Sequence, residues 1–146
     1  MKIHILHEND EWLPPFRKAF AVAGLPHDEW NLAHGAFDLD APPPKGVYYN
    51  RMSASSHTRG HEHAPELTVA VIAWLESYGR RVINGGQAID LEISKVRQYV
   101  AMSRNDITFP KTRFAVGRER ILETARTFGA PLILKPNRGG KCLGVE

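Results

Sequence analysis

Short β-favouring runs and helical repeats alternate along the first 85 residues, and this alternation restricts the fold most. Strands are expected at residues 2–7, 29–32, 46–50 and 81–84, and helices at residues 16–23 and 65–78. Strands that alternate with helices are typical of a three-layer α/β fold with parallel strand pairs. We therefore predict an α/β fold in which helices cover a parallel sheet.

Polar residues follow two of these expected strands directly. Asn50 ends the third strand and Arg51 follows it, and Asn84 ends the fourth. Ligands of parallel α/β sheets bind beyond the carboxyl ends of the strands. Arg51 can bind an acidic group through two hydrogen bonds, and Ser53 adds a hydroxyl group nearby. We predict a substrate site at Asn50, Arg51 and Ser53, with an ordinary surface loop as the alternative.

The polar segment 51–63 also contains three histidines, His57, His61 and His63. Two histidines separated by one residue can chelate a metal ion. No fourth ligand is apparent in the sequence, and solvated loop histidines are the alternative interpretation. We therefore assign no metal ligand to this chain.

The second part of the chain has its own helical repeats. Ser94 can cap a helix that ends at Asn105 and Asp106, and a further helix is expected at residues 118–128. We expect strands at residues 112–116 and 132–134, the latter because Leu-Ile-Leu is typical of a buried strand. The predicted division is a first domain over residues 1–92 and a second over residues 93–146.

Glycines and lysines follow the expected last strand, within the sequence KPNRGGKCLG. Glycines allow backbone N–H groups to form an anion-binding concavity, and lysines add charges that suit phosphate. A hairpin turn with exposed lysines is the alternative. Lys95 lies in the first turn of a helix, which disfavours a cation unless an anion is close by.

Composition excludes several functional classes. The chain has 146 residues, a net charge of +3 and one cysteine, Cys142. A single cysteine excludes an internal disulfide and fits a reducing, cytoplasmic setting. No apolar run is long enough for a membrane span, and no basic block is dense enough to predict nucleic-acid binding.

Several of these motifs, in this order, resemble the entry into an ATP-grasp domain: Lys95 in SKVRQY, Phe109–Thr112, Phe128–Pro131, and finally LILKPNRGGKCLGV. The first part, with GVYYNRMSASS, resembles the N-terminal pre-ATP-grasp domain of the same superfamily. Within it, the chain is most similar to the RimK-like and glutathione-synthetase-like carboxylate–amine ligases. The expected fold is thus a three-layer pre-ATP-grasp domain, followed by the start of an ATP-grasp small lobe.

This resemblance implies an ATP-dependent ligase that phosphorylates a carboxylate, after which an amine attacks the acylphosphate. It implies ATP binding by Lys95, Lys135, Gly139, Gly140, Lys141 and Gly144. The family has its Mg²⁺ ligands in a later segment, which we expect beyond Glu146, so we assign no catalytic residue here and expect no activity from this chain alone. Cys142 departs from the family, which usually has glycine at that position.

Two expectations concern the state of the chain. We expect a truncated protein whose strand near residue 132 lacks a partner, so a homodimer that pairs this edge is one outcome. The alternative to a ligase is a complete chain that binds nucleotide or protein without catalysis.

Overall fold

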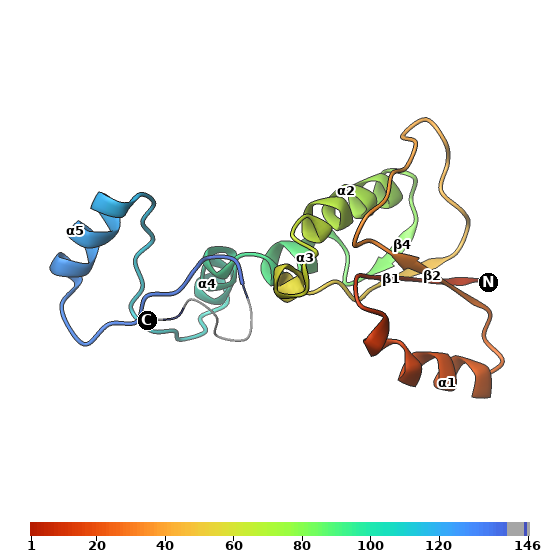
Figure 1. Cartoon of the computed structure of the whole chain (residues 1–146), viewed down its shortest axis with the longest axis horizontal. Helices are drawn as coiled ribbons and strands as arrows, with labels where there is room; N and C mark the ends of the chain where they lie inside the picture. Colours follow the sequence, from red (N-terminus) through yellow and green to blue (C-terminus); the bar gives the residue numbers. More distant parts are fainter. Residues whose placement is uncertain (140–144, 146) are drawn as a thin grey trace. The chain divides into compact units, whose positions relative to one another are not determined.

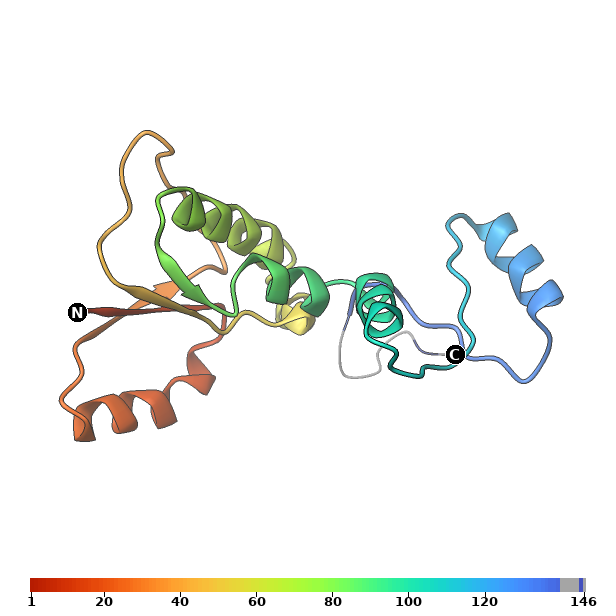
Figure 2. The ribbon, with the colours of Figure 1, turned by 180° about the vertical axis from the view of Figure 1, so that it is seen from behind.

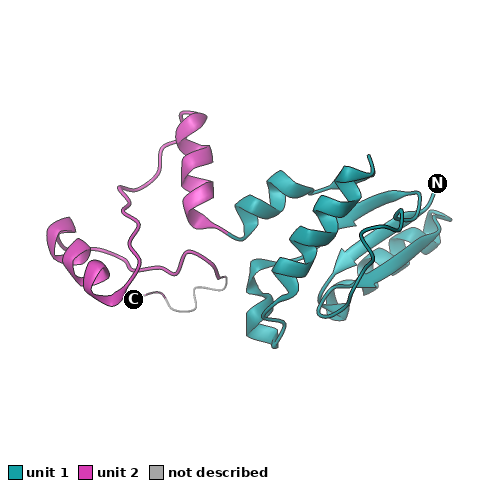
Figure 3. Cartoon of the chain, turned by 90° about the horizontal axis from the view of Figure 1, so that it is seen from above, with its two compact units in different colours: residues 1–93 teal, residues 94–146 magenta. Residues whose placement is uncertain are grey.

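The computed structural model describes residues 1–139 and residue 145. Of the predicted ATP-binding residues, Gly140, Lys141 and Gly144 lie outside this range, as does Cys142. The chain forms two compact units, residues 1–93 and residues 94–146 (Figure 3).

Unit 1 is built on four parallel strands in the order β2-β1-β3-β4. Their bounds are β1 Ile3–His7, β2 His27–Asn31, β3 Val47–Asn50 and β4 Arg81–Ile83. The central strand β1 pairs with β2 on one side and with β3 on the other. The predicted α/β fold with a parallel sheet is confirmed.

Helices cover both faces of this sheet, as Figures 1 and 2 show for α1 (Pro14–Val22) and α2 (Ala64–Ser77). Helix α2 begins with a proline in its first turn, where the missing N–H is not needed. Its buried residues Val71, Ile72 and Leu75 join the main core of the unit. Three elements were not predicted: the short 3-10 helices η1 (Asp10–Trp12) and η2 (Ala54–Arg59), and the helix α3 (Gly86–Glu92).

Aromatic rings pack tightly over the sheet beside Gly46. His4 stacks on Tyr48 with ring centres 4.6 Å apart, and Trp30 meets both rings edge-on. A Cβ atom at Gly46 would lie 2.6 Å from the Lys2 carbonyl oxygen and 2.7 Å from the His4 ring. Only glycine therefore allows β1 and the start of β3 to approach so closely at this point.

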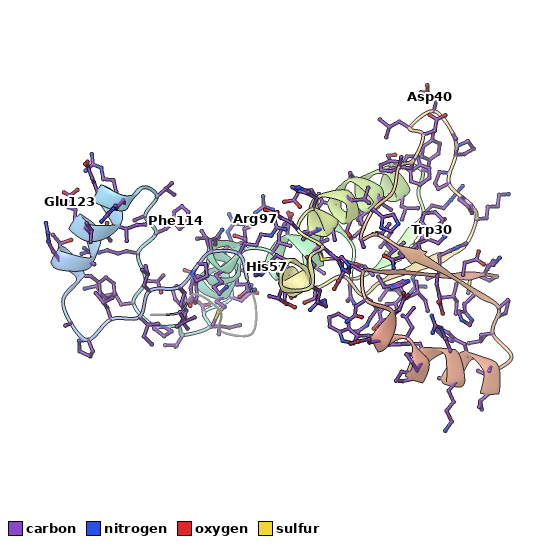
Figure 4. All side chains as sticks on the ribbon, in the orientation of Figure 1. Trp30, Asp40, His57, Arg97, Phe114 and Glu123 are labelled. Carbon is purple, nitrogen blue, oxygen red and sulfur yellow. The ribbon has the colours of Figure 1, made fainter. Side chains whose placement is uncertain are left out.

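Unit 2 contains the helices α4 (Lys95–Arg104) and α5 (Arg118–Phe128), both of which were predicted. Figure 4 shows Glu123 on α5 and Phe114 on the segment before it. The strands predicted at residues 112–116 and 132–134 are wrong, since neither segment is a strand in the structure. A strand needs a hydrogen-bonded neighbour, and neither segment has one among the described residues.

The expected burial of residues 132–134 is also wrong. Leu132, Ile133 and Leu134 are 38%, 67% and 43% exposed. The expected homodimer was argued from an unpaired strand edge at this place, so it loses that argument and stays an untested prediction. None of the helices in the described part of the chain combines the length and the apolar composition that a membrane span requires.

Candidate functional site

A cavity of about 700 Å³ lies in unit 1 where β3 and β4 end. Its walls come from η1 and α1, from the segment that follows β3, and from the end of β4 with helix α3. The lining residues are Glu11, Trp12, Pro15, Phe16, Asn50, Arg51, Met52, Ser53, Asn84, Ala88, Ile89 and Glu92. The three residues predicted to bind substrate thus line one cavity, together with Asn84.

Asn50 and Asn84 join the ends of β3 and β4 through two reciprocal hydrogen bonds. The Nδ2 of Asn50 donates to the Asn84 carbonyl at 3.0 Å, and the Nδ2 of Asn84 donates to the Asn50 carbonyl at 3.2 Å. The Oδ1 of Asn50 also accepts from the Met52 N–H at 3.0 Å. The buried Asn50 side chain is therefore committed to shaping the cavity wall.

Arg51 lies against two aromatic rings on the wall of the cavity. Its Cζ atom is 5.9 Å from the centre of the Trp12 ring and 5.3 Å from that of Phe16. Such cation–π contacts hold the plane of the guanidinium group in place. The Nε atom of Arg51 is buried and has no hydrogen-bond partner among the described residues.

The loop after β3 is fixed by two side chains. The Oγ of Ser53 accepts from the Ser55 N–H at 3.3 Å and so caps η2. The Oε1 of Glu92 accepts from the Ala54 N–H at 3.1 Å. Ser53 therefore has a structural role, and Glu92 connects α3 to the loop.

A fully buried carboxylate, Glu8, is linked to the cavity wall through Arg59, which contacts the lining residue Trp12. Arg59 donates to both of its oxygens, and the Nδ1 of His61 lies 2.9 Å from its Oε2. Burial alone would raise the pKa of Glu8, but the hydrogen bonds and charges of Arg59 and His61 outweigh burial and hold this pKa below 4.5. Arg59 also lies over Trp12, with Cζ 4.7 Å from the ring centre.

The histidines of this segment have separate surroundings. His57, labelled in Figure 4, lies on η2 with its Nδ1 3.1 Å from the Ala54 carbonyl oxygen. His61 contacts Glu8, as described above. In the part of the chain that the structure describes, no three His, Cys, Asp or Glu side chains are grouped so that they could hold a metal ion.

In unit 2, Asn137 brings Lys95 to the start of the glycine-rich stretch. The Oδ1 of Asn137 accepts from the Val96 N–H at 3.0 Å, and its carbonyl oxygen accepts from the Lys95 N–H at 3.0 Å. The Nζ of Lys95 donates to the Gly139 carbonyl at 3.1 Å. Two predicted ATP-binding residues, Lys95 and Gly139, are therefore in direct contact.

Lys135, a further predicted ATP-binding residue, is exposed. The sequence predicted no role for Asn137, although an Asn that follows a proline and precedes a glycine pair by two residues is typical of a turn. It also predicted no role for Trp12, Phe16 and Glu92, because no local pattern shows that they lie near Arg51. The sequence placed Trp12, Phe16 and Glu92 only in segments that follow expected strands.

Comparison with known proteins gives this geometry a context. No protein-family model matches the chain. The chain is similar to two curated proteins, the probable alpha-L-glutamate ligases of Vibrio vulnificus strains YJ016 and CMCP6. Each is 28% identical to it over 159 residues, which cover 99% of this chain and 50% of the relative. The crystal structure of a RimK domain ATP-grasp protein from Sphaerobacter thermophilus DSM 20745 matches 99% of this chain and 52% of its own, with a TM-score of 0.72 and 21% identity.

In fold, the chain resembles about half of the solved RimK domain ATP-grasp protein. It spans about half the length of the curated relatives that it matches. The solved structure is too distant in sequence to carry more than the fold. The activity and the substrates of this chain therefore depend on its own residues.

Proposed function

We propose that this chain contributes the substrate-side unit and the first part of the nucleotide site of an ATP-dependent, glutamate-ligase-like carboxylate–amine ligase. The observation that carries the proposal is the contact between Lys95 and Gly139, fixed by Asn137. It joins the helix lysine and the glycine-rich stretch, the two features that suit a triphosphate. The similarity to probable alpha-L-glutamate ligases supports the same class.

A phosphate group near Lys95 would bind the lysine side chain rather than the backbone N–H groups of the helix. The N–H groups of Val96 and Arg97 are already hydrogen-bonded to Asn137 and Ser94. The Lys95 ammonium group extends from a helix end that Asn137 and Ser94 fix. It can bind an anion once it gives up its hydrogen bond to the Gly139 carbonyl. Preorganised positive charge of this kind stabilises the negative charge that develops in phosphoryl transfer.

In this proposal ATP supplies the phosphoryl group that activates a carboxylate as an acylphosphate. Lys95 and Gly139 hold the nucleotide together with Lys135, Gly140, Lys141 and Gly144. Arg51 orients the substrate in the cavity that Asn50 and Ser53 help to shape. Magnesium would enter with the nucleotide, and we assign its ligands to no described residue. A cytoplasmic location is part of the proposal, since ATP and free amino acids are available there.

Calorimetric titration of the 146-residue chain with ATP and Mg²⁺ tests the nucleotide site. We expect binding that Lys95→Ala weakens at least about tenfold, because one charge-assisted contact contributes about 1.5–3 kcal/mol. Lys18→Ala is the matched control, since Lys18 is exposed on α1 and lies in unit 1. Absence of binding, or equal weakening by both substitutions, would contradict the proposed site.

A further inference from the structure

Acidic and basic residues are divided unequally between the two units of the chain. Unit 1 has eight Lys or Arg and twelve Asp or Glu, which gives a net charge of −4. Unit 2 has eleven Lys or Arg and four Asp or Glu, which gives a net charge of +7. The net charge of +3 for the whole chain conceals this division. Unit 2 therefore carries the excess of positive charge that attracts polyanions.

Three exposed cations of unit 2 lie at the C-terminal end of helix α5. They are Lys111, Arg113 and Arg126, and we call them, with the ring of Phe128, the Phe128 cluster. The Nζ of Lys111 and the Cζ of Arg113 lie 5.4 and 5.6 Å from the centre of the Phe128 ring. Arg113 also donates from Nη1 to the Thr127 hydroxyl at 2.9 Å, and Arg126 lies in the last turn of the helix.

The positive charge of the Phe128 cluster is only partly compensated. The C-terminus of a helix carries about half a negative charge, which favours cations there but cannot balance three of them. Glu123, the carboxylate nearest to them in the sequence of the helix, is paired with Arg120 at 2.8 Å. Among the described residues, no ion pair joins a cation of the cluster to a carboxylate. Because cations that share one ring repel each other, the cluster suits an external anion.

An exposed aromatic ring follows this cluster directly in the sequence. Phe114, labelled in Figure 4, succeeds Arg113 on the segment before α5 and is 60% exposed. Proteins bind single-stranded nucleic acid with this combination, because cations contact the phosphates and aromatic rings stack on the bases. We propose that unit 2 binds single-stranded nucleic acid, with phosphates on the Phe128 cluster and a base on Phe114. The inference does not rest on the proposed ligase function.

The arrangement favours single-stranded nucleic acid over other polyanions. A helix that binds an anionic membrane keeps its apolar face bare for the lipid, whereas Lys111 and Arg113 lie over the ring of Phe128 on α5. An acidic protein segment would pair with the cations and offer no flat base to Phe114. The bases of a duplex are stacked on each other, but those of a single strand are free to stack on an aromatic side chain.

The first test is fluorescence anisotropy of a fluorescein-labelled oligodeoxythymidylate of about 16 nucleotides, titrated with the 146-residue chain. Three phosphate contacts predict a slope of about −2 when the logarithm of the association constant is plotted against that of the salt concentration. Binding should therefore weaken roughly 20-fold between about 50 and 200 mM salt.

Variants then separate the charges from the ring. Lys111→Gln combined with Arg113→Gln should remove two phosphate contacts and reduce the slope to about −0.7. Phe114→Ala should weaken binding at least about fivefold and leave the slope unchanged, because the ring carries no charge. Arg120→Gln is the matched control, since it removes a cation of the same helix that is already paired with Glu123, and the slope should stay near about −2.

ATP titration separates this inference from the proposed function. The doubly substituted chain should bind ATP as the unsubstituted chain does, because the nucleotide site is proposed at Lys95 and Gly139. Loss of ATP binding in this variant would assign the Phe128 cluster to the nucleotide site and overturn the inference. Oligonucleotide binding without ATP binding would instead support the inference and refute the proposed function.

Three further results would overturn the inference. They are no change of anisotropy at about 50 mM salt, equal weakening by Arg120→Gln and by the double substitution, and tighter binding of poly-L-aspartate or of phosphatidylglycerol vesicles than of the oligonucleotide. The substituted side chains are all exposed, so we expect the fold to persist. If the circular dichroism of the double variant changed, Phe114→Ala and the salt dependence of the unsubstituted chain would decide by themselves.

Discussion

Replacing Glu8 by glutamine should strongly destabilise unit 1. The Glu8 side chain is fully buried, while those of its partners Arg59 and His61 are 17% and 33% exposed. Breaking a buried ion pair costs about 3–5 kcal/mol when one charged partner remains. We expect about 3 kcal/mol, the lower end of that range, because Arg59 keeps its hydrogen bond to Ser55 and its contact with Trp12.

Urea denaturation at pH 7 followed by tryptophan fluorescence would measure this loss. All three tryptophans of the chain, Trp12, Trp30 and Trp74, lie in unit 1, so the signal reports on that unit alone. The matched control is Glu29→Gln. Glu29 also binds an arginine through both oxygens, with Arg17 at 2.8 and 2.6 Å, but the Arg17 and Glu29 side chains are 46% and 23% exposed, so water reaches both partners.

The control should lose at most about 1 kcal/mol, because water screens exposed ion pairs and competes for their hydrogen bonds. Equal losses in the two variants would refute the reasoning that burial gives the Glu8 pair its strength. A loss below about 1 kcal/mol in Glu8→Gln would refute it as well.

Three further predictions follow from single contacts. The stability that Glu8 contributes should be fully present above pH 4.5 and lost as the pH falls through its lower folded-state pKa, so acid unfolding followed by fluorescence should show a smaller pH dependence in Glu8→Gln. Asn137→Ala should remove the acceptor of the Val96 N–H in the first turn of α4, while the Ser94 cap remains, at a cost of about 1 kcal/mol. Faster hydrogen exchange of the Val96 amide would measure this loss, and unchanged exchange would contradict the role of Asn137. Gly46→Ala should lower the free energy of unfolding by about 1–3 kcal/mol, because the added Cβ would lie 2.6 Å from the Lys2 carbonyl oxygen. Urea denaturation measures this loss, and an unchanged midpoint would show that β1 and β3 can move apart.

The sequence predicted those helices and strands whose local pattern of apolar residues matches the way they pack in the structure. Helix α5 occupies the predicted residues 118–128, and β3 and β4 lie within the predicted segments. Helix α3 was not predicted, because Gly85 and Gly86 are typical of a turn and the seven-residue helix that follows is too short for a clear repeat. The strand at residues 132–134 was wrong because apolar character alone cannot supply a hydrogen-bonded neighbour.

The candidate site could be predicted only in part for a similar reason. The rule that ligands bind beyond the carboxyl ends of parallel strands placed Asn50, Arg51 and Asn84 together, and they line one cavity. The rule could not predict that Trp12 and Phe16 hold Arg51, since that contact joins segments about 40 residues apart in the sequence. It also could not predict that Asn50 is committed to the backbone of Asn84 and Met52.

The buried Glu8 network explains how two arginines can share one indole ring. Arg59 and Arg51 both lie near Trp12, with Cζ atoms 4.7 and 5.9 Å from its ring centre. Two cations at one ring repel each other unless at least one of them is neutralised. Glu8 neutralises Arg59 from inside the protein, which holds Trp12 in place and leaves Arg51 as the cation at the cavity. The same arrangement that stabilises the fold thus leaves Arg51 as the positively charged side chain among the described residues that line the cavity.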